Sequence, residues 1–519
     1  MIYLMLDNLS CPASESSDSS LEFGDLPLHF NGLIAFAFSW GAQQRKTTSS
    51  ASYGPDFLIV SGLNLIICVP SLSNIIIRVL YYLQIFFCYR LGLSRKRIGY
   101  VLFFTHILCP PNNIKTKLAK LVDFFNQNCY NRMINYGRRC DMPTLIDLFA
   151  GAGGLSLGAA RAGFDVRAAV EIDFHAMDSH RTNFPNTTHI QEDIMSLNGT
   201  DILTQANIQQ QDLIGIIGGP PCQGFSSIGQ GNVKDIRNRL FVKFFELVEE
   251  LQPVFFLAEN VPGIMNEKYD AIRTEAFTHI QGYTMLDSIK VVANDYGAPT
   301  TRTRIFFIGY RNDERLIPFT KEDIEAMQVA DLEKTTVKQA LEGLPERIRY
   351  SAKSKGIQKL QDGYLTGPRI QSQFYFNHAT GLRPDGIGDD TYVQAYIKHQ
   401  IVNGYNPTKH APAVRNRYAK LKYGQQDKIS KSPKLNPDGY CPTLRAGTGP
   451  EKGSYQAVRP IHYRYPRVIT PREAARLQGF PDWYKLPNTI WHGFRQIGNS
   501  VSPIVAERVL LAIRQRLML

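Results

Sequence analysis

The sequence of 519 residues lacks the cysteine patterns that metal sites and disulfide frameworks need. Six of its eight cysteines lie before residue 142, and only Cys222 and Cys441 lie beyond it. No CxxC pair and no His/Cys cluster with metal-ligand spacing occurs, so the sequence predicts neither a metal site nor a disulfide framework. The same lack fits a reducing setting, and we expect a cytoplasmic protein.

Long uninterrupted apolar spans are also missing. Residues 57–72 and 75–91 are apolar runs, but polar or helix-breaking residues interrupt both before 18 residues are reached. The N-terminus has no basic region before an apolar one, which excludes a signal-peptide layout. The sequence therefore predicts no membrane association, although anchoring by residues 1–141 remains the weaker alternative.

Residues 1–141 lack clear helical or strand periodicity, whereas a sharp pattern begins at Met142. We therefore expect residues 1–141 to be an N-terminal segment that is not part of the functional protein. A start codon assigned too far upstream would explain it, with Met142 as the expected start and Met133 as the second choice.

Acidic residues are scarce in one segment. Residues 351–467 hold 19 Lys and Arg against seven Asp and Glu, a surplus that equals the whole formal charge of +12. A basic surplus confined to one segment is typical of a surface that contacts a polyanion, although any single lysine there can simply be solvated. The segment is rich in Tyr, Gly, Asn and Pro, and we expect a small irregular domain of short strands and loops.

What the sequence does contain is a series of short apolar strands that end in distinctive turns. The run 145–149 precedes a turn with Gly151, Gly153 and Gly154, and such glycines let the backbone approach a ligand closely. The pattern G-x-G-x-x-G is not completed, because Ser156 stands at its sixth position, which disfavours an NAD site.

Acidic residues follow the next two strands. The strand 166–170 ends in Glu171, twenty residues after Gly151, where a carboxylate can bind both hydroxyls of a ribose. Asp193 stands at a further strand end, where it could accept the adenine amino group. These turns predict an adenosine cofactor that lies across the carboxyl edge of the sheet.

A thiol follows the apolar run 212–217. Glycines and prolines stop that strand, so Cys222 is expected at the carboxyl end of a buried parallel strand, where open α/β sheets bind ligands. A buried, inert cysteine is the alternative. The Pro-Pro-Cys turn and the polar loop after it favour an exposed nucleophile.

A carboxylate and two arginines stand near the ends of further strands. Glu259 closes the apolar run 255–258, where a general acid is needed beside a nucleophile; the alternative is a solvated loop carboxylate. Arg302 and Arg304 precede the strand 305–310 and, being two residues apart, are expected on one face of an extended segment. They predict donors to a base carbonyl or a phosphate, with plain surface charge as the alternative.

Residues 142–519 resemble the DNA (cytosine-5) methyltransferases of bacterial restriction–modification systems. Six blocks carry the resemblance in the family's order: DLFAGAGGLSLG, GGPPCQGFS, AENVPG, the RTR box, TPREAARLQGFP and QIGNSV. Thr300 departs from the pattern, because the family usually has glutamine there. Residues 1–141 match nothing in the pattern.

The resemblance implies an α/β fold with a doubly wound, Rossmann-like S-adenosylmethionine-dependent methyltransferase sheet and a second, smaller target-recognition domain. It implies a cofactor-binding and catalytic domain over 142–310. A target-recognition domain with a joining helix would cover 311–487, and the C-terminal segment 488–519 would return to the catalytic domain.

The resemblance also implies a reaction. A methyl group would pass from S-adenosylmethionine to C5 of a cytosine in a specific duplex DNA sequence, through an adduct of Cys222 with C6 of a flipped base. Protonated Glu259 would hydrogen-bond N3 and Arg304 the O2 carbonyl, with Arg302 supporting the loop. The family's cofactor contacts carry over to Phe149, Ala150, Gly151, Gly153, Gly154, Glu171, Ile172, Asp193, Ile194, Pro221, Leu240, Asn499 and Ser500. Its DNA contacts carry over to Gln223, Ser226, Thr443, Leu444 and Arg445.

The implied partners are double-stranded DNA and a cognate restriction endonuclease that acts on the same sequence. We expect a monomer in the bacterial cytoplasm, associated with the nucleoid through DNA. Two alternatives stay open, an RNA (tRNA) cytosine-5 methyltransferase of the same fold and a non-catalytic DNA-binding regulator.

Overall fold

The computed structural model describes residues 142–221, 238–345, 348, 356–446 and 459–518, together with three short strands nearer the N-terminus. The chain divides into two units, Met1–Cys129 and Tyr130–Leu519. In the first unit, β1 (Ile2–Leu4), β3 (Leu65–Cys68) and β2 (Phe57–Val60) pair antiparallel in that order. Within the described residues, no helix has both the length and the apolar character that a membrane crossing needs.

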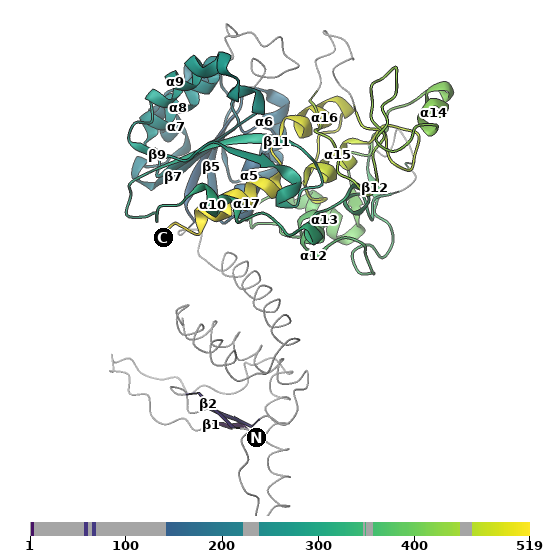
Figure 1. Cartoon of the computed structure of the whole chain (residues 1–519), viewed down its shortest axis with the longest axis horizontal. Coiled ribbons are helices and arrows are strands. Elements are labelled where there is room, and N and C mark those ends of the chain that lie inside the picture. Colours follow the sequence, from purple (N-terminus) through teal and green to yellow (C-terminus); the bar gives the residue numbers. More distant parts are fainter. Residues whose placement is uncertain are drawn as a thin grey trace, which may run out of the picture. The chain divides into compact units, whose positions relative to one another are not determined.

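The second unit is built on an eight-stranded mixed sheet with the order β10-β11-β8-β7-β4-β5-β6, in which β9 pairs with β11 (Figure 1). Its parallel strands are β4 (Thr144–Leu148), β5 (Asp165–Val170), β6 (Thr188–Ile190), β7 (Leu213–Gly218) and β8 (Phe255–Asn260). The antiparallel ones are β9 (Tyr283–Met285), β10 (Ile289–Val292) and β11 (Thr303–Arg311). The chain winds outward in both directions from β4, which confirms the predicted doubly wound α/β fold.

The strand order places the site. From β4 the chain proceeds to β5 and β6 on one side and to β7 and β8 on the other, so the switch point lies between β4 and β7. Ligands of open α/β sheets bind in the crevice outside the carboxyl ends of the strands at such a point. A Cβ added at Gly218 would lie 2.4 Å from the carbonyl oxygen of Leu148, so glycine permits the close approach of these two strand ends.

Helices cover both faces of the sheet (Figure 1). On one side α5 (Gly154–Arg161) packs along α17 (Pro503–Arg514), and a Cβ added at Gly158 would collide with Ala506. On the other side lie α7 (Gly199–Ala206), α8 (Arg239–Leu251) and α9 (Asp270–Thr278). Each face forms its own apolar cluster, in which Leu145 and Val505 lie on one side and Ile146 and Phe245 on the other.

The expected joining helix is present at residues 471–478, but helices also form within residues 351–467, where we expected short strands and loops, so the recognition part, residues 311–487, is more helical than predicted. Its described residues hold only two strands, β12 (Gln358–Lys359) and β13 (Ile401–Val402). Its helices are α10 (Lys321–Glu325), α11 (Val337–Ala340), α12 (Gln373–Thr380), α13 (Asp390–His399), α14 (Pro412–Ala419) and α15 (Pro471–Gln478). Most begin at a polar capping side chain such as Ser372, Asp389 or Thr470, and these caps start helices too short for a periodic apolar stripe.

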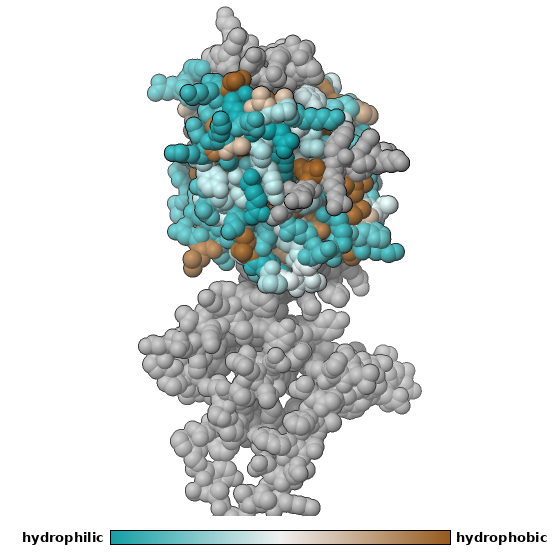
Figure 2. Space-filling view, turned by 90° about the vertical axis from the view of Figure 1, so that its right-hand side faces the viewer, coloured by the Kyte–Doolittle hydropathy of each residue, from teal (hydrophilic) through white to brown (hydrophobic). Residues whose placement is uncertain are grey.

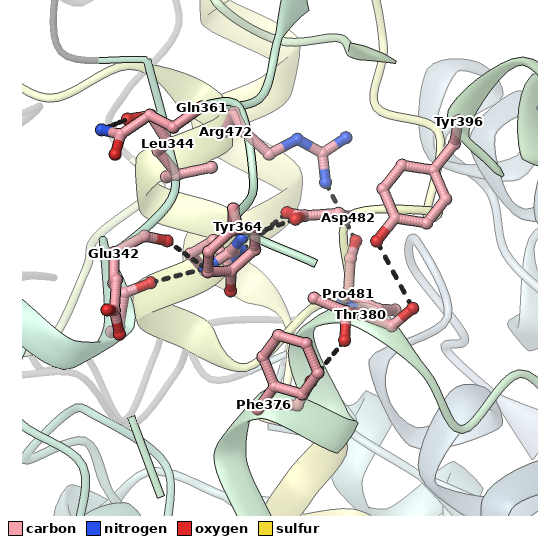
Figure 3. A network of polar contacts seen from close by, with 12 residues as sticks. Glu342, Leu344, Gln361, Tyr364, Phe376, Thr380, Tyr396, Arg472, Pro481 and Asp482 are labelled. Atoms are coloured by element: carbon pink, nitrogen blue, oxygen red, sulfur yellow. Dashed lines mark hydrogen bonds and ion pairs between the residues drawn. The ribbon is translucent and has the colours of Figure 1, made fainter. Parts of the chain in front are cut away.

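A buried polar network fixes α15 (Figure 3). The fully buried Arg476 donates to Asp482 from Nε to Oδ1 at 2.6 Å and from Nη2 to Oδ2 at 2.5 Å. Its Nη1 donates to the carbonyl of Ala340 at 2.9 Å. Arg472 donates to the carbonyls of Pro481 and Tyr484. Because every charge of this network has a partner, and all these partners lie within residues 311–487, the network holds α15 in one arrangement inside this part of the chain.

Candidate cofactor and catalytic site

The turn after β4, residues 149–154, is a strained segment that we call the glycine turn. Phe149, Gly151 and Gly153 all have left-handed backbones, with φ of 61°, 57° and 84°. The Gly151 amide donates to Glu171 Oε2 at 3.0 Å, and the Asp173 amide donates to Oε1 at 2.8 Å. Burial raises the pKa of Glu171, and these two backbone donors oppose the rise. Each oxygen keeps a lone pair that can accept a ribose hydroxyl.

The predicted adenosine contacts lie at adjacent strand ends. The Glu171 amide donates to Ile190 at the end of β6, which brings Glu171 beside Asp193 and Ile194. Ile172 is 64% exposed although it is apolar, whereas Ile194 is buried. Phe149 and Leu240 are half-buried, and Asp193 is exposed with one oxygen accepting from the Met195 amide at 3.0 Å. An exposed aliphatic side chain beside a carboxylate suits a planar base next to its ribose.

The end of α16 (Ile490–Asn499) lies beside the glycine turn. A Cβ added at Gly154 would come within 2.4 Å of the Val501 carbonyl oxygen. The Asn499 side chain is exposed, whereas the Ser500 hydroxyl donates to the Gln496 carbonyl at 2.8 Å. The structure thus brings the predicted residues of the C-terminal segment to the predicted cofactor turn.

A chain of polar side chains, buried except for the half-buried His189, runs beneath the glycine turn. The Ser156 hydroxyl donates to Asp147 Oδ2 at 2.5 Å and lies 3.0 Å from His180 Nε2. His180 Nδ1 lies 2.9 Å from His189 Nε2. No sequence pattern predicts this chain of contacts, because Ser156 stands out in the sequence only as a break in a glycine pattern. Burial raises the pKa of Asp147 to about 7, and the nearby Glu171 adds to the rise.

As the pH rises from about 4 to about 7, we expect Asp147 to make the wild-type protein less stable. Asp147→Asn should abolish this contribution to the pH dependence of stability. In this window the unfolded chain binds fewer protons at Asp147 than the folded chain does, so a rising pH destabilises the wild-type protein. The three-unit shift corresponds to on the order of 4 kcal/mol. Burial and Arg181 lower the pKa of His189 to about 4, which acts in the opposite direction but is common to both proteins.

Urea unfolding of both proteins at pH 4.5 and pH 8 measures this effect. The variant should gain stability relative to wild type at the higher pH, since asparagine can still accept from Ser156. A difference between the two proteins that is the same at both pH values contradicts the expectation.

Glu259 and Arg304 meet at the carboxyl edge, on the neighbouring strands β8 and β11. Arg304 Nε lies 2.6 Å from Glu259 Oε1, and Glu259 is only 7% exposed. The contact lacks hydrogen-bond alignment, and this buried oxygen has no hydrogen-bond donor within the described part of the chain. A Cβ added at Gly219 would lie 3.3 Å from Oε2, so the carboxylate borders the start of the predicted thiol loop.

The thiol loop itself begins at the limit of the described residues. The Asn260 side-chain amide donates to the Pro220 carbonyl at 3.4 Å, which ties the start of the loop to the end of β8. Pro221 is half-buried. The predicted nucleophile Cys222 and the predicted DNA contacts Gln223 and Ser226 lie outside the described residues.

Arg302 lies apart from Glu259 in a buried position. It is 3% exposed and donates from Nη1 to the Leu444 and Gly498 carbonyls at 3.2 and 2.9 Å. Its Nη2 donates to the Asn499 carbonyl at 3.3 Å. This arginine therefore joins two segments predicted to contact DNA and cofactor, respectively.

The predicted DNA contacts Thr443, Leu444 and Arg445 belong to the recognition segment, residues 441–446. Thr443 and Arg445 are exposed, and Leu444 is buried between them. Thr300, the departure from the family pattern, is buried. Its backbone forms an isolated β-bridge with that of Cys441. Its hydroxyl accepts from the Arg302 amide at 3.3 Å. Thr300 thus helps to hold the recognition segment.

Comparison with known proteins decides the family. The family model for C-5 cytosine-specific DNA methylase matches residues 143–515. The chain belongs to this family. Type II methyltransferase M.XorII of Xanthomonas oryzae pv. oryzae is 35% identical over 370 residues, which covers 71% of this chain and 83% of that protein. M.DdeI of Desulfomicrobium norvegicum is 34% identical over 387 residues, covering 70% and 86%.

A solved structure agrees with this assignment. An E. coli protein encoded within a prophage and described as a DNA modification methyltransferase is 48% identical, with a TM-score of 0.63. The match covers 72% of this chain and 99% of that chain. The methylase therefore transfers a methyl group from S-adenosylmethionine to C5 of cytosine in DNA. Exposed Ile172, the Glu171 carboxylate and the glycine turn fit the adenosine end of this cofactor.

Gly498 is the point where the recognition segment rests on α16. A Cβ there would lie 2.5 Å from both the Ala446 nitrogen and the Arg445 carbonyl carbon, which are backbone atoms that cannot rotate away. We expect Gly498→Ala to displace the recognition segment and to lower kcat/KM of the methylase for DNA at least tenfold, because a shift of about 1 Å at a reacting site is costly. The overpacking should cost about 1–3 kcal/mol of stability.

The matched control is Gly282→Ala, since a Cβ added at Gly282 meets nothing within 4 Å. Rates of labelled methyl incorporation into bacteriophage DNA from a methylation-deficient host, with melting temperatures of both variants, make the comparison. Equal rates for the two variants would show that the recognition segment tolerates the shift.

Proposed function

We propose that the chain methylates one cytosine within a specific duplex DNA sequence and serves as the modification partner of a restriction endonuclease. The observation that carries this proposal is the meeting of Glu259 and Arg304 beside Gly219, at the edge where the predicted cofactor residues also lie. The type II names of the relatives support the restriction–modification setting. We further propose a monomer that acts in the bacterial cytoplasm.

The proposed mechanism begins at Cys222. C5 of cytosine is a weak nucleophile, and attack of the Cys222 thiolate on C6 breaks the C5–C6 double bond and makes C5 electron-rich. Because C6 is inaccessible inside a duplex, the target base has to be flipped into the site. Bound S-adenosylmethionine supplies the methyl group that C5 takes up. The C5–H bond then breaks, its electrons restore the C5–C6 double bond, and the thiolate leaves with the proton passed to a base.

Glu259 and Arg304 act on the same ring. In its protonated form, Glu259 donates to N3, so that negative charge does not build up on the ring when the thiolate attacks. Arg304 uses Nε toward Glu259 and Nη1 toward the Thr303 carbonyl, which leaves Nη2 for the O2 carbonyl. Arg302 supports the recognition segment and the end of α16 by donating to three of their backbone carbonyls.

Bisulfite sequencing of DNA from cells that express the full chain tests the proposal. We expect protected cytosines at one position of a single short sequence and none in cells that express Cys222→Ser. Bisulfite sequencing of transfer RNA from the same cells tests the RNA alternative. Protection in transfer RNA without protection in DNA overturns the proposal.

A further inference from the structure

The stretch that follows α15, residues 481–486, contacts both the rest of the recognition part and the glycine turn, and we call it the connecting segment. Asp482, Trp483 and Tyr484 in this segment are at most 2% exposed. Figure 2 views the molecule from the side on which α14 lies, and the described surface there is mainly hydrophilic. The connecting segment adds little to the protein surface, because most of its side chains are buried.

Side chains of the recognition part hold the backbone of the connecting segment. Arg472 donates from Nη1 to the Pro481 carbonyl at 2.9 Å and from Nη2 to the Tyr484 carbonyl at 2.7 Å. The Asn403 side-chain amide donates to the Leu486 carbonyl at 2.7 Å, and its oxygen accepts from the Leu486 amide at 3.2 Å. Because both of these side chains are buried, water does not compete for their hydrogen bonds.

The connecting segment also contacts the catalytic domain, through Asn183 and Tyr484. Asn183 is the last residue of α6 (Phe174–Asn183). Its side chain donates to the Lys485 carbonyl at 3.0 Å and accepts from the Lys485 amide at 3.0 Å. The Tyr484 hydroxyl donates to the Ala152 carbonyl in the glycine turn. The paired hydrogen bonds of Asn183 therefore place the neighbouring Tyr484 so that its hydroxyl reaches the glycine turn.

The glycine turn needs outside contacts to keep its shape. Phe149 has a left-handed backbone, which is strained for a residue with a side chain and persists only where the surroundings hold it. A Cβ added at Gly153 would lie 2.3 Å from Phe184 Cε2, so the turn rests directly on that ring. The Ala152 carbonyl shares a rigid peptide plane with the Gly153 amide. The hydrogen bond from Tyr484 therefore sets the orientation of this plane.

This peptide plane borders the expected ribose contact. The Gly151 amide, one residue before Ala152, donates to Glu171 Oε2 at 3.0 Å. We infer that Tyr484 is a positioning residue, whose hydroxyl holds the glycine turn in the form that binds S-adenosylmethionine. Since the recognition part anchors the connecting segment, contacts outside the catalytic domain contribute to cofactor affinity. This role concerns cofactor binding alone and does not depend on which DNA sequence is methylated.

The test compares Tyr484→Phe, which removes only the hydroxyl, with the matched control Tyr375→Phe. Tyr375 is as buried as Tyr484, and its hydroxyl also donates to a backbone carbonyl, that of Arg476, at 2.6 Å. Each variant thus removes one buried tyrosine donor, but only the donor of Tyr484 reaches the glycine turn. Calorimetric titration with S-adenosylmethionine in the absence of DNA measures cofactor affinity, and melting temperatures measure stability.

Tyr484→Phe should raise the dissociation constant for S-adenosylmethionine about threefold to tenfold. A turn without this restraint is in its binding form only part of the time, and the apparent dissociation constant rises as that fraction falls. At saturating cofactor, kcat should stay within about twofold, because the groups expected to act on the base are unchanged. Tyr375→Phe should lower the melting temperature by a similar amount but keep the wild-type dissociation constant. Wild-type affinity in Tyr484→Phe, or equal losses of affinity in the two variants, overturns the inference.

Hydrogen exchange followed by mass spectrometry gives a second measurement that does not depend on affinity, since it reports local opening of the backbone. Without cofactor, the peptide that covers residues 149–157 should exchange faster in Tyr484→Phe than in wild type. In Tyr375→Phe its exchange should not change. Weakened binding without faster exchange of this peptide contradicts the proposed role. If wild type binds the cofactor but methylates no DNA, the proposed function fails while this comparison still holds.

Discussion

Replacement of Cys222 by serine is expected to abolish methylation while DNA and cofactor binding persist. A hydroxyl ionises far less readily than a thiol, whose ordinary pKa is about 8.5, so serine cannot supply the anion that attacks C6. Loss of a covalent nucleophile removes the intermediate and not just one contact, and we expect kcat to fall at least about 10³-fold.

The matched control for this substitution is Cys441→Ser. Cys441 is fully buried, burial raises the pKa of its thiol, and its backbone pairs with Pro299 and Thr301. It cannot act as a nucleophile there, so its replacement should leave kcat within about threefold and lower only stability. Radiolabelled methyl incorporation into DNA measures both variants.

Covalent trapping adds a readout that does not depend on turnover. DNA that contains 5-fluorocytosine has no C5 proton to lose, so the adduct between Cys222 and C6 should persist through denaturing electrophoresis. Wild type should give this shifted band and Cys222→Ser should not. A chain that binds DNA but never forms the band would be the non-catalytic regulator, and a Cys222→Ser variant that methylates at the wild-type rate would falsify the mechanism.

The strands of the catalytic domain could be predicted from sequence because their signal is local. Buried parallel strands read as continuous apolar runs, and β7 and β8 are buried at every position. Glu171 directly follows β5 and Glu259 lies near the end of β8, so the sequence alone places both carboxylates at a shared edge. The carboxyl ends of parallel strands lie at one edge of a sheet, so motifs that are far apart in sequence can be predicted to form one site.

The contacts that hold the site together could not be predicted in the same way. Arg302 donates to Leu444 and Gly498, and the Tyr484 hydroxyl donates to the Ala152 carbonyl of the glycine turn. These partners are far apart in sequence, and no local pattern encodes which carbonyl a buried arginine finds. The short helices of the recognition part were missed for a related reason, since α12 and α13 depend on a capping side chain and tertiary packing.

Glu259→Gln is expected to lower kcat by about 10²- to 10³-fold with little change in cofactor affinity. Glutamine keeps the size of the side chain and can donate an N–H to N3, but it cannot transfer a proton, so charge builds up on the ring when the thiolate attacks. It also removes the negative partner of Arg304, which lies 2.6 Å from Glu259 Oε1. Glu171, which is expected to bind the ribose, is a separate carboxylate beneath the glycine turn.

The two carboxylates allow a cross-comparison. Glu171→Gln should weaken S-adenosylmethionine binding at least about tenfold while leaving kcat at saturating cofactor within a few-fold, because Glu171 is expected to contact the ribose and not the reacting base. Glu259→Gln should show the reverse pattern, in calorimetric cofactor titrations and in single-turnover methylation of the same DNA. Oε1 of Glu259, which is buried and pairs with Arg304 without an aligned hydrogen bond, gives this contrast its structural basis. If both variants lost cofactor affinity alone, Glu259 would be part of the cofactor site and N3 would need another donor.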